Sequence, residues 1–378
     1  MQSHSRFVCP VTLDSASAQT RGPSSWSPWT HPPTCSSGED VVPHGKGGLS
    51  IVTTPETAAA SMDLWDEDEP RLPPEAATGK RQHHPRAYKI VDIPGRGKGI
   101  LATRNIKQHE AFMVDYAALV VDLDVADMLA REAGYSLLSV AAEQVSPALS
   151  AKVLGLAQTS TAALHPVENV LRSNAFHAVL GADDDSHMAV FPDLSRINHA
   201  CMPNAFPRLV PRSLAVSVAA ARDIAPGEEI TISYISLGQT RDARQKALLR
   251  WEFECKCPLC NASDDEVTAS DAHRTAIDEM RVAVAAVAHS HDPETTDGDR
   301  ERALDTIRDL FPRLIDEGMF TAYSEQYANA GRIYWALGDY GQARFYAQRS
   351  LDVLADQGFI AAADERSLHM LLQSFDGQ

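Results

Sequence analysis

The sequence of 378 residues lacks a long apolar run, since its longest stretches of this kind are Val282–Ala288 and Leu214–Ala221. A membrane-spanning helix needs roughly 18 or more consecutive apolar residues, so we expect no membrane anchor. Residues 1–30 also lack the unbroken apolar centre of a secretory signal. We therefore expect an intracellular protein with reduced thiols, located in the nucleus, the cytoplasm or both.

Basic residues are scarce as well: 34 Lys and Arg stand against 51 Asp and Glu, which gives a formal net charge of -17. A phosphate backbone would have to approach an overall negative field, so direct binding of nucleic acid is not expected. Residues 261–320 hold fifteen acidic side chains against six Arg and no Lys. This acidity is either the solvated face of a set of helices or a docking surface for a basic partner.

Residues 1–86 are rich in Pro, Ser, Thr, Gly and charged side chains, and they include the acidic run 66–69. Such a segment buries too little apolar surface to become fully ordered, so we expect it to be largely flexible. One strand is expected near 49–54, because this β-prone stretch follows the glycine turn 45–48. That strand would add to the main domain.

From Tyr88 onward, short β-prone runs alternate with Gly and Pro turns, which predicts a domain of short strands over residues 87–250. The predicted strands are 88–93, 100–103, 189–191, 214–220 and 229–235. A helical insertion at about 122–172 interrupts them, because apolar residues recur at helical spacing between 127 and 158, with Pro147 between two helices. The chain is predicted to be helical from 263 to 378, so the fold class is α+β.

Within the helical part, small and aromatic residues recur at a regular spacing. They are Tyr327, Ala330, Gly331, Tyr334, Ala343 and Ala347, with the turn 338–340 between the two halves. The spacing fits one tetratricopeptide-like unit of two antiparallel helices, and it also fits a plain helical hairpin. One such unit cannot bury its own apolar face, so we expect it to pack on neighbouring helices or on the strand domain.

Three of the six cysteines, Cys255, Cys257 and Cys260, lie within six residues in a C-x-C-x2-C spacing. Thiolates this close fit three corners of a tetrahedron around Zn²⁺. Cys201 is the expected fourth ligand, because the other two cysteines lie in the weakly structured leader. Buried core thiols or a redox pair are the alternatives, and the polar C-x-C-P-x-x-C setting favours zinc. Four cysteines leave no open coordination position, so the zinc would be structural.

Further blocks carry candidate chemistry. Block 196–204 reads Arg-Ile-Asn-His-Ala-Cys-Met-Pro-Asn, and alone its Asn-His pair would be an ordinary loop with a hydrogen-bonded histidine. The glycine-rich block 95–102 frees the backbone to approach a ligand closely. It lacks the following helix of a phosphate-binding loop, so a nucleotide triphosphate site is not expected. Downstream lie 228–234, Glu-Glu-Ile-Thr-Ile-Ser-Tyr, and 251–255, Trp-Glu-Phe-Glu-Cys.

The chain resembles the SET domain, and in particular its SMYD-like branch and fungal relatives, in five motifs that follow one another in order. These are the glycine block, the Asn-Ala-Phe at 174–176, the Asn-His-x-Cys-x-Pro-Asn, the Pro-Gly-Glu-Glu-Ile-x-x-x-Tyr and the C-x-C-x2-C. The resemblance is strong over 87–262 and weaker over the helical tail and around 29–33. It implies a β-rich SET domain with a helical insertion, a post-SET zinc segment at 251–262 and an all-helical, tetratricopeptide-like C-terminal domain.

The resemblance implies a protein lysine N-methyltransferase that uses S-adenosylmethionine and acts on an exposed lysine of a histone tail or another basic protein. Tyr234 is the implied catalytic residue, which would orient the lysine amine. The implied donor-binding residues are Arg96, Gly97, Lys98, Gly99, Asn174, Asn198, His199, Tyr234, Trp251 and Phe253. The implied ligands of the zinc ion are Cys201, Cys255, Cys257 and Cys260.

Two departures from the family pattern bear on function. Trp251 stands where many SMYD relatives have Tyr, so a hydroxyl of the lysine channel is missing and the number of methyl groups added stays open. The MYND zinc finger of SMYD proteins is absent, because no cysteine lies between Cys35 and Cys201. The alternative function is a catalytically weak SET-fold module that binds a protein partner. In either case we expect a monomer.

Overall fold

The computed structural model describes residues 34–37, 48–54, 57, 86–124, 129–180, 185–209, 214–357 and 372 of the chain. Two compact units make up the chain, and each combines separate stretches of sequence. The first unit comprises Met1–Arg104, Ala111–Asn198 and Leu209–Ala219, and the second comprises Asn105–Glu110, His199–Arg208 and Ala220–Gln378. Most of the leader 1–86, including the stretch 29–33, lies outside the described residues.

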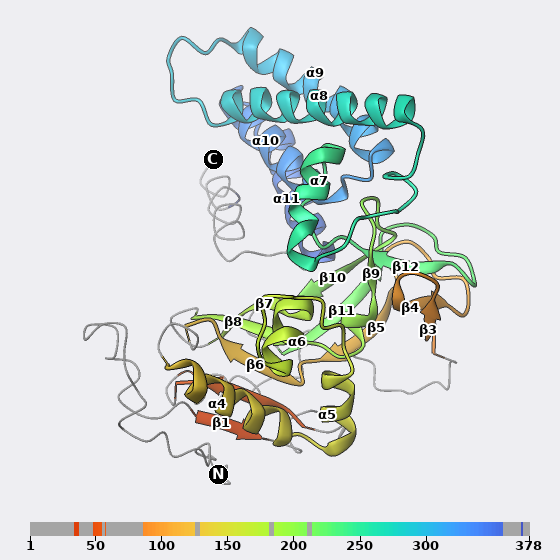
Figure 1. Cartoon of the computed structure of the whole chain (residues 1–378). Coiled ribbons are helices and arrows are strands. Elements are labelled where there is room, and N and C mark those ends of the chain that lie inside the picture. The colour runs from red at the N-terminus through yellow and green to blue at the C-terminus, as the bar shows by residue number, and fades with distance from the viewer. Residues whose placement is uncertain are drawn as a thin grey trace. The chain divides into compact units, whose positions relative to one another are not determined.

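The first unit contains a five-stranded sheet with the strand order β1-β2-β6-β8-β7 (Figure 1). Its strands are β1 (Thr34–Ser37), β2 (Ser50–Thr53), β6 (Leu119–Asp122), β7 (Phe176–Leu180) and β8 (Asp185–Val190). β2 runs parallel to β6, whereas the other neighbours pair antiparallel. Every residue of β2 and β6 is buried. The strand predicted near 49–54 is therefore an interior strand of this sheet.

The helical insertion between β6 and β7 consists of α4 (Arg131–Glu143), α5 (Pro147–Leu154) and α6 (Pro166–Asn174). α5 and α6 both begin with Pro, whose missing N–H is not needed in the first turn of a helix. The helices share an apolar core with the sheet, formed by Val52, Leu119, Val121, Leu137, Ala141, Val153, Val170, Leu171 and Val190. α4 and α5 are the two helices predicted on either side of Pro147, whereas α6 lies beyond the periodic stretch that predicts them.

Two further strand pairs belong to the first unit. β3 (Tyr88–Ile93) and β4 (Gly97–Ala102) form an antiparallel hairpin, and β5 (Ala111–Tyr116) pairs antiparallel with β11 (Ala215–Ala220). β11 is buried along its whole length, and Ser217 is its only polar residue. β4 begins earlier than predicted, because the glycine turn itself continues into the strand.

Asp115 of β5 fixes the chain just before the Asn-His motif. Its carboxylate accepts hydrogen bonds from the backbone N–H groups of Asp193 at 2.7 Å and Leu194 at 2.9 Å. These bonds hold the start of the one-turn helix η2 (Leu194–Arg196), which leads into β9 (Asn198–His199). Burial raises the pKa of Asp115 to about 6.

We predict that Asp115 makes the stability of the protein depend on pH. Its pKa in the folded state lies above the ordinary 3.8, so its contribution to stability is full in acid and is lost as the pH rises through about 6. The free energy of unfolding of the wild type minus that of Asp115→Asn should therefore fall mainly between about pH 4 and 6, by at most ~1.4 kcal/mol per pH unit. Chemical denaturation at several pH values measures the difference, and a constant difference would contradict the prediction.

The second unit includes the loop that starts at His199 of the Asn-His motif. The N–H of Ala200 donates to the carbonyl of Ile232 at 2.9 Å, which ties this loop to β12 (Glu229–Ile232). β10 (Ala205–Leu209) follows the loop. α7 (Arg241–Leu248) and the one-turn helix η3 (Leu249–Trp251) then lead into the cysteine-rich segment.

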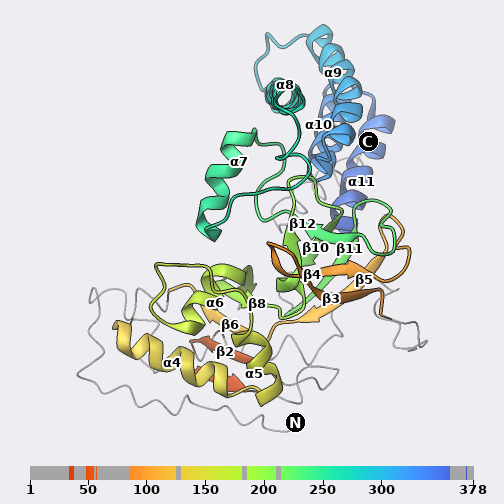
Figure 2. The ribbon, with the colours of Figure 1, turned by 45° about the vertical axis from the view of Figure 1, so that its right-hand side comes forward.

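The C-terminal part of the second unit is helical, as predicted. Its helices are α8 (Asp264–Ala288), α9 (Asp297–Asp316), η4 (Phe320–Ala322), α10 (Tyr323–Ala336) and α11 (Tyr340–Gln357). α8 packs beside α9, and α10 packs beside α11 (Figure 1 and Figure 2). Ser263 and Thr296 begin α8 and α9 with capping boxes, which satisfy backbone N–H groups that a helix leaves unpaired.

The α10–α11 pair depends on small residues at its crossing. A Cβ on Gly331 would lie 3.2 Å from the Ala347 nitrogen and 3.3 Å from the Ala343 oxygen, so the two backbones are close enough that glycine is preferred there. The predicted helix pair and its contact residues are therefore present, while its relation to tetratricopeptide repeats stays a prediction. Within the described residues, we find no helix that is both long and apolar enough for a membrane span.

Candidate functional site

The glycine-rich turn of the β3–β4 hairpin is shaped by backbone conformation and by close packing. Gly95 and Gly97 have φ angles of +72° and +68°, which strain residues with a side chain. Gly99 is buried, and a Cβ there would lie 2.5 Å from Ile93 Cδ1 and 2.7 Å from Asn198 Nδ2. The absent side chain of Gly99 thus makes room for Asn198, and the structure brings these two predicted donor-binding residues together.

Arg96 in this turn and Lys98 at the start of β4 lie on either side of Gly97, and both side chains are exposed. The ammonium of Lys98 pairs with the Asp92 carboxylate across the hairpin at 3.0 Å. Such an exposed pair contributes little to stability and is easily broken. Lys98 therefore has a partner in this structure, and a contact with a ligand would require the ammonium to leave it.

Asn174, at the end of α6, is buried and already engaged. Its Nδ2 donates to the carbonyls of Ala157 at 2.7 Å and Val170 at 2.8 Å, so both N–H groups of the amide have partners. The backbone carbonyl of Asn174 accepts a hydrogen bond from the Ser195 hydroxyl at 3.3 Å, which links α6 to η2. If the Asn174 side chain contacts a bound ligand, the Oδ1 atom is therefore the one available for that contact.

His199 is buried and bridges two other predicted site residues. Its Nδ1 accepts from the backbone N–H of Tyr234 at 3.1 Å, and its Nε2 lies 3.3 Å from the sulfur of Cys201. Because Nδ1 accepts, we assign the ring proton to Nε2, which then donates to the Cys201 sulfur. The imidazole therefore connects the cysteine cluster to the backbone of Tyr234.

Tyr234 lies in a tight turn directly after β12. Strand β12 ends at Ile232, earlier than predicted, because the Ser233 hydroxyl donates to the carbonyl of Ile235 at 2.7 Å and closes the turn. The turn holds the half-buried Tyr234 ring beside the His199 ring, with centroids 5.4 Å apart.

Aromatic rings surround Tyr234 on several sides. The Trp251 ring lies 5.3 Å from that of Tyr234, and the Phe253 ring meets it edge-on at 6.4 Å. Phe253 also lies 6.2 Å from His199, as measured between ring centroids. Glu252, between the two aromatic residues, has a left-handed backbone with φ of 57°, a strained conformation that is often found at functional sites. The predicted residues of the second unit thus form one aromatic cluster.

The four predicted zinc ligands gather beside this aromatic cluster. The sulfur atoms of Cys201, Cys255, Cys257 and Cys260 all lie within 4.8 Å of one another. The Cys201 sulfur is 3.8 Å from that of Cys255 and 3.5 Å from that of Cys260. These separations are far longer than a disulfide bond. They match the spacing of about 3.8 Å between sulfurs that follows from tetrahedral zinc with Zn–S bonds of about 2.3 Å.

The thiols also shift one another's protonation. Hydrogen bonds with Cys255 and the other cluster thiols raise the pKa of Cys201, and burial acts in the same direction. Hydrogen bonds with Cys201 lower the pKa of Cys257, and they lower the pKa of Cys260 to about 7. Thiolate character is therefore favoured at Cys257 and Cys260, and thiolates are the form that binds metal.

Asn204 is a structural residue of the motif whose role the sequence did not reveal. Its Nδ2 donates to the Glu228 carboxylate at 3.1 Å and to the Glu229 carbonyl at 2.8 Å, while its Oδ1 accepts from the Thr231 N–H at 2.8 Å. The side chain is buried. It therefore fastens the loop carrying His199 to the strand that leads to Tyr234.

We predict that Asn204→Ala lowers the free energy of unfolding by roughly 2–4 kcal/mol, because it leaves the buried Thr231 N–H without its acceptor. Thermal and chemical denaturation measure the change. The matched control is Asn261→Ala at an exposed position, where we expect a change within about 0.5 kcal/mol. Equal stability of the two variants would contradict the clamp role of Asn204.

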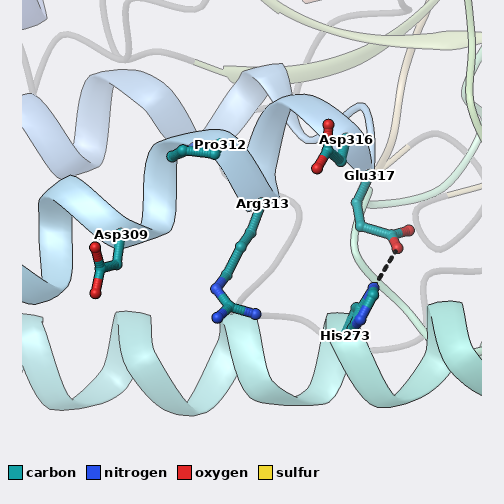
Figure 3. A pocket seen from close by; sticks show the side chains of 6 residues that line it. All are labelled: His273, Asp309, Pro312, Arg313, Asp316 and Glu317. Atoms are coloured by element: carbon teal, nitrogen blue, oxygen red, sulfur yellow. Dashed lines mark ion pairs between the residues drawn. The ribbon is translucent and has the colours of Figure 1, made fainter.

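A separate hollow of about 470 Å³ lies between α8 and α9 (Figure 3). It is lined by His273, Asp309, Pro312, Arg313, Asp316 and Glu317. The His273 Nδ1 atom lies 3.7 Å from the Glu317 carboxylate. None of the predicted site residues lines this hollow, so it is not the candidate active site.

Comparison with known proteins identifies the domain. Residues 97–235 match the family model of the SET domain. Over this range the chain is similar to SET domains. The matched range includes Gly97, Asn198 and Tyr234, whereas the C-x-C-x2-C segment and its two preceding aromatic residues follow it in the sequence.

Proteins similar to this chain come from both predicted groups. The chain is 28% identical over 187 residues to histone-lysine N-methyltransferase set5 of Schizosaccharomyces pombe, a match covering 48% of this chain and 52% of that protein. It is 36% identical over 81 residues to N-lysine methyltransferase SMYD2-B of Danio rerio, covering 21% and 18%. It is 40% identical over 80 residues to protein-lysine N-trimethyltransferase SMYD5 of Mus musculus, covering 20% and 19%. The chain thus spans about half the length of the first relative and about a fifth of the others. The resemblance to the SMYD-like and fungal SET proteins is confirmed.

Proposed function

We propose that the chain is a protein lysine N-methyltransferase, which transfers a methyl group from S-adenosylmethionine to a lysine of a histone or another basic protein. The observation that carries this proposal is the aromatic cluster around Tyr234, which lies beside four clustered cysteines. The SET domain and the lysine methyltransferases among the relatives support the same reaction.

When bound, S-adenosylmethionine supplies a methyl group on a positively charged sulfur. The neutral lysine nitrogen forms a bond to the methyl carbon as the carbon–sulfur bond breaks, its electron pair stays on sulfur, and a proton then leaves the nitrogen for solvent. No covalent bond to the enzyme is needed, so catalysis consists of aligning the reacting atoms and excluding water. An apolar, aromatic channel also lowers the pKa of the lysine by desolvation, which favours the neutral amine.

We assign Tyr234 to the orientation of the lysine amine and to the stabilisation of the charge that develops on it. This assignment is supported by the way in which the ring is held. Trp251 and Phe253 pack against it, and the backbone N–H is bound by His199. We propose that Trp251 and Phe253 also form walls of the lysine channel and of the adenine site.

For donor binding we propose ten residues, Arg96, Gly97, Lys98, Gly99, Asn174, Asn198, His199, Tyr234, Trp251 and Phe253. We further propose one structural zinc ion per chain, held by the four cysteines whose spacing fits it.

The proposed substrate is a basic protein with an exposed lysine. A net charge of -17 supports such a partner, because an acidic protein attracts basic chains over a distance. The name of the fission yeast relative, which is a histone-lysine methyltransferase, points to the same class. We propose that the chain works as a monomer inside the cell, in the nucleus or the cytoplasm.

The test is methyl transfer from radiolabelled S-adenosylmethionine by the purified, zinc-loaded chain, first to core histones and then to proteins of a cell extract. We expect label on lysine side chains, identified by amino-acid analysis. Donor binding without transfer to any protein would favour the alternative, a SET-fold interaction module, for which Trp251 in place of the usual Tyr is the supporting observation.

A further inference from the structure

A zinc ion held by four thiolates has a formal charge of −2, because each cysteine must be deprotonated to bind. Burying such a charge is costly unless nearby groups donate hydrogen bonds or carry the opposite charge. Three of the four cysteines here are buried, and Cys260 is partly so. Lys256 lies between two ligands in the sequence, but its side chain is exposed to solvent. Within the cysteine segment, the Cys257 N–H donates to the Cys255 sulfur at 3.5 Å, but a buried positive charge must come from another element.

Arg244 of α7 is placed to supply it. Its side chain is only 1% exposed, and its Nη2 atom donates to the Cys260 sulfur at 3.7 Å. With Cys260 in the thiolate form that binds metal, this contact is a charge-assisted hydrogen bond from a buried cation to the sulfur.

The remaining bonds of Arg244 extend from the cysteines into the helical part. Its Nη1 donates to the Gln239 carbonyl at 2.7 Å and lies 3.5 Å from the Asp271 carboxylate of α8. The Gln239 carbonyl also accepts from Arg274 at 3.2 Å, and Arg274 pairs with Glu317 at 2.8 Å. A continuous polar chain thus runs from the Cys260 sulfur to the end of α9.

We propose that Arg244 is the counter-charge of the zinc centre, which retains the metal by donating to the Cys260 thiolate and couples the centre to helices α7 and α8. This inference rests on the zinc site of the proposed function. Arginine suits the task because its guanidinium stays charged and offers several donors in a fixed plane, so it serves a thiolate, a carbonyl and a carboxylate together. Lysine would keep the charge but not this set of simultaneous bonds.

The test is the rate at which the full-length, zinc-loaded chain releases zinc to a chromogenic chelator. We expect Arg244→Gln to release zinc about 10–100-fold faster than the wild type, and Arg244→Lys to lie between the two. Asp271→Asn is the matched variant at the other end of the ion pair. It removes the carboxylate that competes with the Cys260 sulfur for the Arg244 guanidinium, so we expect zinc release to be unchanged or slower. The Arg241 N–H at the start of α7 keeps one side-chain oxygen of residue 271 as an acceptor in place of two.

The different effects of Arg244→Gln and Asp271→Asn on the rate of zinc release distinguish a counter-charge role of Arg244 from a purely structural role. If Arg244 only holds the fold, Asp271→Asn and Arg244→Gln both release zinc faster, in step with their loss of thermal stability, and the inference is overturned. Cobalt-substituted protein gives a second readout that does not require the loss of metal. Removal of an N–H donor from a thiolate raises the energy of the sulfur electrons, so the sulfur-to-cobalt charge-transfer band should move to longer wavelength in Arg244→Gln and less in Arg244→Lys.

Two outcomes remain distinct. Wild-type protein that binds no zinc or cobalt would overturn the zinc site itself, and with it the role of Arg244. A normal zinc content, combined with unchanged release and an unchanged cobalt band in Arg244→Gln, would overturn the role of Arg244 alone. Neither readout depends on methyl transfer, so the proposed enzymatic function is tested independently.

Discussion

Tyr234→Phe is expected to lower the rate of methyl transfer about ten- to a thousandfold while leaving the fold, the zinc content and the affinity for the donor intact. The change removes one hydroxyl and keeps the ring packed among His199, Trp251 and Phe253. The backbone N–H that binds His199 also remains. The expected loss corresponds to about 1.4–4 kcal/mol of transition-state stabilisation.

The measurement is the initial rate of methyl incorporation at saturating donor, with the donor affinity of each variant taken from calorimetry. Tyr340→Phe is the matched control, because it removes a hydroxyl from an exposed ring on α11 and should leave the rate unchanged. If Tyr234→Phe keeps the wild-type rate, its assigned role is wrong. If the variant also loses donor affinity, the hydroxyl acts in binding rather than in orienting the amine.

Cys257→Ser is expected to have the second large effect, the loss of most bound zinc together with at least a tenfold loss of donor affinity. A structural zinc ion contributes directly to folding free energy, and three thiols hold zinc far less tightly than four. The cluster packs against Trp251 and, through Cys201, against His199. Its collapse should therefore disorder residues that we assign to the donor site.

Zinc is measured by atomic emission on the purified proteins, and donor affinity by calorimetry. Cys9→Ser, at a cysteine far from the cluster in sequence, controls for the loss of a thiol. Full donor affinity in a zinc-free Cys257→Ser protein would show that the metal does not support the donor site. Full zinc content in the variant would show that Cys257 is not a ligand.

The chemistry of the second unit was the part most open to prediction from sequence. The spacing of three cysteines within six residues favoured a zinc site over buried core thiols or a redox pair, and Cys201 was the one remaining candidate in the folded part. The structure places all four sulfurs within bonding reach of one ion. The grouping of Tyr234 with Trp251 and Phe253 was implied by the resemblance to the SET domain, and local sequence patterns alone indicated only the strand that precedes Tyr234.

Other features depend on partners that are distant in sequence, and no local pattern reveals them. The amide of Asn174 is used by carbonyls of α6 and of the loop before it, which only the fold determines. Arg244 lies on a polar helix that gives no sign of a fully buried charge. Most of α6 lies within the helical insertion predicted at about 122–172, but its own bounds were not predicted.

The most direct test of the central claim is a calorimetric titration of the zinc-loaded wild-type chain with S-adenosylmethionine. It needs no knowledge of the protein substrate, which makes it more decisive than any single methylation assay. We expect one donor molecule bound per chain, displaced by the demethylated product S-adenosylhomocysteine. The absence of any binding heat and of any competition by the product, in protein that is folded and carries one zinc ion, would contradict the assignment as a methyltransferase.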